Sequence, residues 1–357
     1  MRVFSVLFLI LFSSITFGYS YQGGDTPAIT ISAVGDIMIG TWYPNRSYLP
    51  PDSGKDIFNG VKDYLEADIV FGNLEGTLCD KRIESKKCRG REKSACYVFK
   101  MPESFGKIIS DAGFSLLSIA NNHIWDFGEE GMRTTVKTLE ANGFNYAGTE
   151  DIPFCEFEAN GLKIGFIAFS PNRRTNNMND YPCAAKMISA LKQENDIVIV
   201  SFHGGGEGSK YRHVTGKKEY YFSEYRGNVN EFAHLAVDAG ADLVLGHGPH
   251  VSRAVEVYKG RLIAYSLGNF CTYGRFNLQG SNGVAPILKA KLNARGEFIE
   301  GNIISIKQIG RGIPVADDGN TALKEIIKLT DEDIPENGII IDETGVLMPA
   351  GRATNVQ

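Results

Sequence analysis

Two histidines follow an apolar run in LVLGHGPHV, residues 243–251. His247 and His250 are three residues apart, and only Gly248 and Pro249 separate them. Glycine permits close backbone approach and proline restricts backbone rotation, so the two imidazoles can converge on one point. Imidazole is a common ligand of zinc and iron. The stretch therefore predicts a metal site at the end of a strand.

Polar residues also follow other apolar runs. Taken alone, Asp36 suits a turn that ends a strand, and His203, like His213 and His234, suits a hydrogen-bonded structural histidine. Glu75 is harder to explain in this way, because FGNLEG is otherwise apolar and small and a carboxylate there needs a partner. The combination predicts one or two divalent transition metal ions, manganese, zinc or iron. The candidate site residues are Asp36, Asn73, Glu75, Asn121, Asn122, His123, His203, Glu207, His247, His250, Ser266 and Asn269.

Alternating strand and helix patterns must position these side chains. Asn160-Gly161 and Lys259-Gly260 are typical of tight hairpin turns. Strand–helix alternation followed by hairpins predicts a mixed α/β fold, a two-sheet sandwich with helices on the outside. In open α/β sheets, ligands bind at the carboxyl ends of the strands. Strand patterns cover 28–36, 67–76, 114–123, 196–205 and 241–250, and helix patterns cover 55–67, 102–113, 129–143, 184–195 and 229–240.

The domain organisation follows from the same patterns. We expect one catalytic domain over residues 27–310, because no linker or repeat interrupts it. Residues 311–357 are acidic and contain one helix pattern at 321–330 and a short strand pattern at 337–341. We expect this tail to form a small C-terminal appendage on the edge of the domain.

The N-terminus predicts export. Residues 1–20 have a positive charge at Arg2, an apolar stretch and small residues before a plausible cleavage point. The apolar stretch is shorter than a spanning helix requires, which favours a cleaved signal peptide over an uncleaved membrane anchor. We expect an extracellular or periplasmic protein, with anchoring to the cell membrane as the alternative.

The overall composition is that of an ordinary globular protein. Of the 357 residues, 43% are hydrophobic and 22% are charged, with a net charge of −5. A nucleic-acid partner is not expected, because such binding requires a basic surface. Given export, a disulfide is expected among Cys79, Cys88 and Cys96 in a polar insertion, with the pairing left open.

Six motifs in order carry a resemblance to a known family. GDIM, GNLEG, ANNHxxD, FHGGGE, GHGPH and YSLGNF resemble the CapA family of bacterial capsule or poly-γ-glutamate synthesis proteins, over about residues 28–275. That family is similar in fold to the calcineurin-like metallophosphoesterases, which implies a four-layer sandwich.

The resemblance implies roles for individual residues. The implied metal ligands are Asp36, Glu75, Asn122, His203, His247 and His250. The implied catalytic residues are Asp36 and His123, the latter as an acid or electrostatic stabiliser. From their places at the strand ends, we expect Asn73, Asn121, Glu207, Ser266 and Asn269 to lie around the substrate.

The sequence also departs from the phosphoesterase pattern. The pattern begins Asp-x-His, whereas Asp36 is followed by Ile37 and Met38. Glu75 stands where a bridging aspartate is usual, and the last two histidines are three rather than two residues apart. One metal therefore lacks a usual imidazole, and whether it is weak, differently built or absent stays open.

Three functions remain open from sequence. The first is an exported metal-dependent hydrolase or transferase of capsule biosynthesis, acting on an anionic polymer such as poly-γ-glutamate or on a phosphoester. The second is a non-catalytic component that binds polymer or membrane capsule-synthesis proteins. The third is a secreted phosphoesterase, which the fold alone would suggest.

Overall fold

A computed structural model describes residues 28–85 and 96–351 of the chain. The predicted signal peptide or anchor lies outside these residues. In the described part, no helix is long and apolar enough to cross a membrane.

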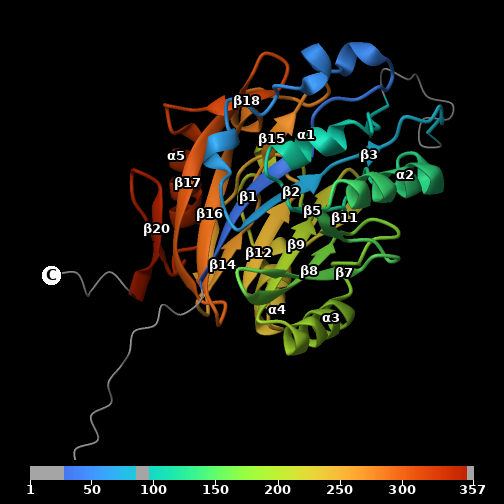
Figure 1. Cartoon of the computed structure of the whole chain (residues 1–357). Helices are drawn as coiled ribbons and strands as arrows, with labels where there is room; N and C mark the ends of the chain where they lie inside the picture. Colours follow the sequence, from blue (N-terminus) through green and yellow to red (C-terminus); the bar gives the residue numbers. More distant parts are fainter. Residues whose placement is uncertain (1–27, 86–95, 352–357) are drawn as a thin grey trace, which may run out of the picture.

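Two β-sheets form the centre of the molecule (Figure 1). The larger sheet has the order β19-β20-β17-β16-β1-β2-β5-β6, with β15 beside β1 and β18 beside β17. The smaller sheet has the order β13-β14-β12-β9-β8-β7. The larger sheet contains β1 (Ala28–Met38), β2 (Ile69–Leu74), β5 (Leu116–Ser118), β6 (Asn145–Ala147), β15 (Asn269–Thr272), β16 (Val284–Asn293), β17 (Phe298–Ile309), β18 (Ile313–Ala316), β19 (Ile339–Ile341) and β20 (Val346–Pro349). The smaller sheet contains β7 (Phe154–Ala159), β8 (Leu162–Phe169), β9 (Ile197–His203), β12 (Leu243–His247), β13 (Val255–Tyr258) and β14 (Arg261–Ala264).

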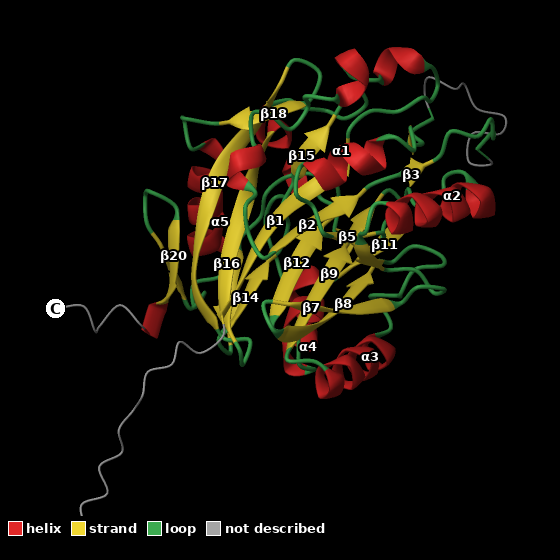
Figure 2. Ribbon diagram, in the orientation of Figure 1, coloured by secondary structure: helices red, strands yellow, loops and turns green. Residues whose placement is uncertain are grey.

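Helices cover the outer faces of both sheets (Figure 2). Side chains of α1 and α2 pack with the outer face of the larger sheet, and side chains of α3 and α4 with that of the smaller sheet. The predicted four-layer, two-sheet α/β sandwich is therefore confirmed. The helices are α1 (Phe105–Asp111), α2 (Gly128–Ala141), α3 (Tyr181–Glu194), α4 (Val229–Asp238) and α5 (Thr321–Asp333). Two small ladders lie outside the sheets, β3 (Thr77–Leu78) with β4 (Lys100–Met101) and β10 (Glu219–Tyr221) with β11 (Glu224–Gly227).

Side chains alternate between the two faces of each strand, and this alternation explains the layers. In β9, Ile197 and Ile199 face the core between the sheets, whereas Val198 and Val200 face the core beneath the helices. All four side chains are buried, so both faces of the strand are covered. Burial of each such aliphatic side chain contributes about 1.5–3 kcal/mol. The near-continuous apolar run in the sequence reflects this burial on both sides.

The predicted hairpins are present, but one predicted helix is not. Asn160 and Gly161 both have positive φ between β7 and β8, as do Lys259 and Gly260 between β13 and β14. The helix predicted over 55–67 is wrong, because this segment forms turns and one short 3-10 helix.

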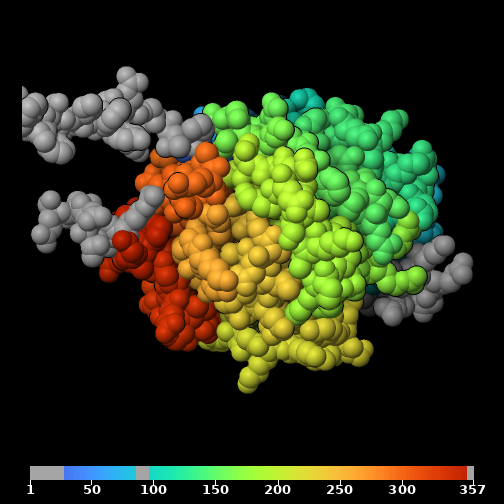
Figure 3. Space-filling view, turned by 90° about the horizontal axis from the view of Figure 1, so that it is seen from below, coloured from blue at the N-terminus to red at the C-terminus, as the bar shows by residue number. Residues whose placement is uncertain are grey.

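The tail beyond residue 310 continues the larger sheet. Its strands β18 and β20 pair with β17, and β19 pairs with β20. Its helix α5 contributes Leu323 and Ile326 to the core between the two sheets. Figure 3 shows the C-terminal residues, in red, lying directly against the orange and yellow part of the chain.

The cysteines divide into two groups. Cys96 is disulfide-bonded, as expected for the polar insertion, whereas Cys79 is free. Cys88 lies outside the described residues.

Candidate metal centre

The two sheets bring the predicted donors to one edge of the sandwich. In the larger sheet, Asp36 at the end of β1 is in register with Asn73 of β2, and Glu75 follows that strand directly. In the smaller sheet, His203 at the end of β9 is in register with His247 at the end of β12. Parallel pairing thus aligns strand ends that are far apart in the chain.

Three donors from different strands converge most closely. Ligand atoms of Asp36, Glu75 and His203 all lie within 4.8 Å of one another, and all three residues are buried. His250 lies next to them, with Nδ1 2.9 Å from Oδ2 of Asp36 and Nε2 3.7 Å from Oε1 of Glu75. His247 Nδ1 is 3.6 Å from Oδ1 of Asp36, beyond hydrogen-bond distance. The structure therefore brings together the acids and histidines that the sequence singled out.

Glu75 and His247 have buried polar atoms that lack hydrogen-bond partners within residues 28–85 and 96–351. Both carboxylate oxygens of Glu75 and both ring nitrogens of His247 are in this state. A buried, unpaired carboxylate costs several kcal/mol, so native structures normally pair such a group or place it on a metal. These atoms lie beside a second carboxylate and a second imidazole, which is a donor set that suits a divalent transition metal.

His203 faces donors on both sides. Its Nδ1 lies 3.5 Å from Nδ2 of Asn73, and its Nε2 lies 3.4 Å from Nη2 of Arg226. A neutral imidazole has one N–H, and neither neighbour can accept it. Burial, and then the charge of Arg226, hold the pKa of His203 well below its usual value. The ring thus stays neutral, which is the form in which an imidazole nitrogen can bind a cation.

The carboxylates and His250 have strongly displaced pKa values. Burial opposes ionisation of Asp36, but contacts with His247 and His250 outweigh it and hold the pKa of Asp36 well below its usual range. Burial raises the pKa of Glu75 well above its usual value, and the charge of Asp36 adds to this. Burial acts to lower the pKa of His250, but Glu75 and Asp36 raise it to about 10. Displacements of this kind are typical of functional sites.

His123 is oriented by an acid that the sequence reading did not assign to the site. Its Nδ1 lies 2.7 Å from Oδ2 of Asp126, and its ring packs on Phe99 with centroids 4.1 Å apart. Its Nε2 lies 3.9 Å from Oε1 of Glu75. A proton carrier held by a carboxylate in this way can donate a proton beside the metal ligands. The His-x-x-Asp spacing is the signal that could have identified Asp126.

Three of the expected substrate residues are engaged inside the protein. Asn73 donates to Oδ1 of Asp36 at 2.8 Å and accepts from Asn121 at 3.1 Å. Asn121 also bonds the carbonyl of Leu74 and the amide of His123, and Ser266 donates to the carbonyl of Val251. Asn73, Asn121 and Ser266 thus hold the ends of the strands in position.

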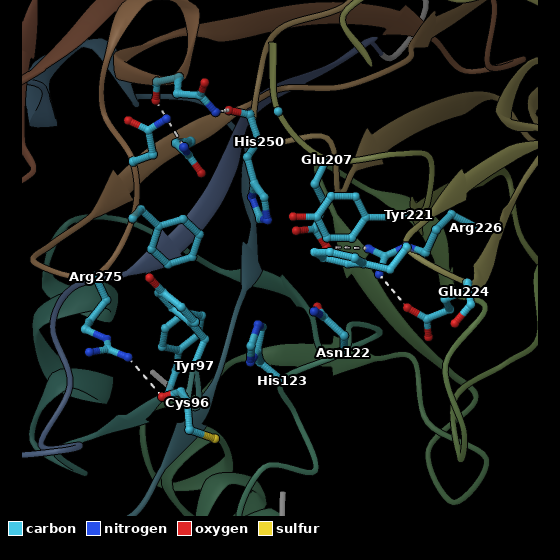
Figure 4. A pocket seen from close by; sticks show the side chains of 18 residues that line it. Cys96, Tyr97, Asn122, His123, Glu207, Tyr221, Glu224, Arg226, His250 and Arg275 are labelled. Atoms are coloured by element: carbon cyan, nitrogen blue, oxygen red, sulfur yellow. Dashed lines mark hydrogen bonds and ion pairs between the residues drawn. The ribbon is translucent and has the colours of Figure 1, made fainter. Parts of the chain in front are cut away.

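A cavity of about 960 Å³ opens next to the donors (Figure 4). His250, His123 and Asn122 lie between two flanking groups, Tyr221 and Arg226 on one side and Arg275 and Tyr97 on the other. Asn269 and Glu207 also line this cavity, and the buried Oδ1 of Asn269 has no hydrogen-bond partner in the described part of the chain. The expected substrate residues Asn269 and Glu207 are therefore placed where a substrate could reach them.

Glycine is required where the histidine loops meet. Gly248 has φ of 112°, and a Cβ there would lie 2.6 Å from the carbonyl oxygen of Gly204. Gly204 follows His203 and donates its amide to the carbonyl of His247 at 2.8 Å. The two histidine loops can pack this closely only because position 248 lacks a side chain. This contact explains the tight backbone in the motif GHGPH.

Comparisons with known proteins match most of the described chain. The model of the family described as "Bacterial capsule synthesis protein PGA_cap" matches residues 30–273. The chain is 29% identical over 263 residues to "Capsule biosynthesis protein CapA" of Bacillus anthracis, covering 68% of this chain and 59% of that protein. It is 30% identical over 260 residues to "PGA biosynthesis protein CapA" of Bacillus subtilis strain 168, covering 68% and 63%. The matches thus span about six-tenths of the length of these relatives.

Among solved structures, the chain is similar to a hypothetical protein from Thermus thermophilus. The TM-score is 0.47 at 16% identity, covering 78% of this chain and 99% of that chain. A likeness this loose carries no argument about function.

Proposed function

Because the chain belongs to the bacterial capsule synthesis protein PGA_cap family, we propose that it acts in the biosynthesis of a capsule-type anionic polymer such as poly-γ-glutamate. The proposed chemistry is metal-dependent hydrolysis or group transfer on the polymer or on a phosphoester. The observation that carries this proposal is Glu75, a fully buried carboxyl group beside Asp36 and His203 whose two oxygens accept no hydrogen bond from the described residues. Among the described residues of the family-matched region, no other group so clearly requires a cation.

The residues around Glu75 would hold a manganese, zinc or iron ion. We assign Asp36, Glu75, His203 and His247 as the central ligands, with Asn122 and His250 at the cavity side. A bound divalent ion polarises the scissile group and lowers the pKa of a bound water. Asn73 supports this arrangement because it donates to Asp36 and fixes the direction of that carboxylate.

His123 would donate a proton to the leaving group. Asp126 accepts a hydrogen bond from Nδ1 of the ring. The proton that the ring can exchange therefore lies on Nε2, on the side of Glu75 and the cavity. Phe99 packs on the ring and limits its rotation. General acid catalysis of this type typically contributes about 10²- to 10⁴-fold in rate.

The expected site of action of the protein is the cell envelope. A capsule polymer lies outside the cytoplasm, and residues 1–20 have the composition of a signal peptide or anchor. We therefore propose an exported protein that works at the cell envelope with the polymer and with membrane capsule-synthesis proteins.

The test compares metal content and turnover in two variants. Glu75→Gln removes the charge but keeps the shape, so purified protein should lose bound transition metal, as measured by elemental analysis. Asp126→Asn leaves the ligand set unchanged, so it should keep the metal. It should lose roughly hundredfold in kcat on whichever substrate wild type cleaves, because His123 is no longer oriented. Poly-γ-glutamate and p-nitrophenyl phosphate are the substrates to compare.

The outcomes separate the alternatives. Full metal occupancy in Glu75→Gln would contradict the proposed site. Metal binding without turnover of either substrate class would favour a non-catalytic assembly component. Turnover of phosphoesters alone would favour a secreted phosphoesterase.

A further inference from the structure

Arg226 is a buried cation in the wall of the cavity, outside every motif that the sequence singled out. It lies in β11, its side chain is 1% exposed, and it lines the cavity beside Glu207 and His250. Its carbonyl accepts the amide of Gly205 at 2.8 Å, which fixes β11 to the loop after β9. Burial of a guanidinium costs several kcal/mol unless it is well paired. Its position therefore indicates a function for the charge.

The contacts of Arg226 within the described residues leave one N–H of its guanidinium without an acceptor. Nη1 donates to Glu224 at 3.0 Å, and Nη2 lies 3.2 Å from Oε1 of Glu207 and 3.4 Å from Nε2 of His203. Nε is buried and has no hydrogen-bond partner among the described residues. Glu224 is about half exposed, so one of the two acids is only loosely committed to the guanidinium. Figure 4 shows Arg226 and Glu224 on the side of the cavity opposite Arg275.

Glu207 and Glu224 pair with the charge of Arg226, but a bound divalent cation would add further positive charge beside it. Nη2 touches His203, one of the proposed ligands of a divalent cation, so guanidinium and metal would repel each other across a buried site. An oxyanion that contacts both cations removes this repulsion. Arginine is the side chain best suited to that contact, because its planar fork matches phosphate and carboxylate oxygens.

We infer that Arg226 binds an oxyanion of the substrate, a phosphate or a carboxylate, which also faces the metal centre. This inference rests on the proposed function and adds a specificity-determining residue to it. A substrate without an anionic group at the reacting end would make no charge-assisted contact with Arg226, so neutral esters and amides would be poor ligands.

The experiment is a calorimetric titration of manganese-loaded protein, freed of excess metal, with inorganic phosphate and separately with glutarate. Arg226→Gln should weaken binding of the preferred anion by roughly tenfold or more, while metal content stays at the wild-type level. Arg212→Gln is the matched control, because Arg212 lies in the same segment and contacts His213 outside the cavity. It should bind the anion as wild type does. The two titrants distinguish a phosphate from a carboxylate substrate.

Glu224→Gln is a second variant that distinguishes a lost contact of Arg226 from a damaged fold. It frees Nη1 without removing a buried group, so it should tighten anion binding by roughly threefold, a gain that damage to the fold cannot produce. Equal affinities for wild type and Arg226→Gln would overturn the inference, even where the metal is bound and the proposed function stands. If Arg226→Gln does not fold, an unchanged or weaker affinity in Glu224→Gln would overturn it. If wild type binds no metal, the proposed function fails, and the same comparison in metal-free protein decides the role of Arg226.

Discussion

Glu75 and His250 couple the stability of the fold to pH. The pKa of Glu75 is raised well above its usual value, chiefly by burial, and that of His250 is raised to about 10 by Glu75 and Asp36, against the opposing effect of burial. A group whose pKa is raised on folding stabilises the protein below its unfolded pKa. That stability is lost as the pH rises through the folded value. Both groups therefore destabilise the metal-free protein as pH rises. Asp36, whose pKa is lowered, is already ionised at neutral pH.

This linkage predicts that metal stabilises the protein more as pH rises. A bound cation replaces the protons on Glu75 and His250. The metal-loaded protein therefore does not lose the stability that the metal-free protein loses when these two groups deprotonate. The gap in Tm between manganese-loaded and chelator-treated protein should widen from pH 6 to pH 9. The window follows from the unfolded pKa of histidine, about 6.5, and the folded value of about 10. Scanning calorimetry at four pH values measures it, and a constant or narrowing gap would argue against these two proton sites.

Residue types and spacing singled out acids and histidines that the fold brings together, because each follows a recognisable strand. They could not show which amides are used internally, and so Asn73 and Asn121 looked like substrate residues although both bond neighbouring side chains. Arg226 lies in the stretch 208–228, whose mixture of aromatic and basic residues fits either a lid or polymer-binding rim or plain surface. A tyrosine- and lysine-rich stretch is as typical of exposed surface as of a cavity wall, and only folding places Arg226 against His203.

At the scale of elements, the β10–β11 hairpin is held by one buried ion pair. Arg253 donates from Nη1 and Nη2 to the two oxygens of Glu219, at 2.9 and 2.7 Å, and Arg253 is fully buried. Glu219 also accepts the amide of Gly206 at 2.8 Å. Glu219 therefore ties the hairpin that carries Arg226 both to the segment after His250 and to the loop after His203.

Glu219→Gln should destabilise the protein by about 3 kcal/mol, because it leaves a buried guanidinium without its charge partner. Glu300→Gln removes the acid of the exposed pair Lys291–Glu300 and should cost about 1 kcal/mol or less. Urea denaturation of the two variants gives the comparison. Similar losses in both would mean that the hairpin is not anchored through this pair.

Helices and strands were predicted correctly wherever a single spacing of hydrophobic residues dominates the sequence. The segment 55–67 shows the limit of that reading. Its apolar residues Ile57, Phe58, Val61 and Leu65 are buried as a helix face would be. Its hydrogen bonds mostly join residues three apart, and Gly60 packs against the backbone of Pro314, where a Cβ would lie 2.9 Å from the carbonyl oxygen. This tertiary contact with a distant strand overrides the local pattern and was invisible in the sequence.

At the scale of the whole molecule, the tail connects the two sheets. Helix α5 packs on β16 and β17 of the larger sheet and on β13 of the smaller one. Thr330 of α5 accepts the amide of Val255 through Oγ1 at 3.1 Å. The sequence predicted the helix but placed it in an appendage, because hydrophobic spacing shows that a helix has a buried face and not which surface covers it.

If the tail is part of the folding unit, a core residue in α5 should affect the stability of the whole protein. Ile326 is 1% exposed in the core between the sheets, and Ile340, in the tail strand β19, is 38% exposed. Ile326→Ala should lower the free energy of unfolding by about 2–4 kcal/mol through lost burial and a cavity. Ile340→Ala should lower it by less than about 1 kcal/mol. Urea unfolding of metal-loaded protein, followed by both fluorescence and circular dichroism, should give one coincident transition for each variant. A second transition that appears in Ile326→Ala alone would show that the tail unfolds by itself, and the sandwich of residues 27–310 would then be stable without it.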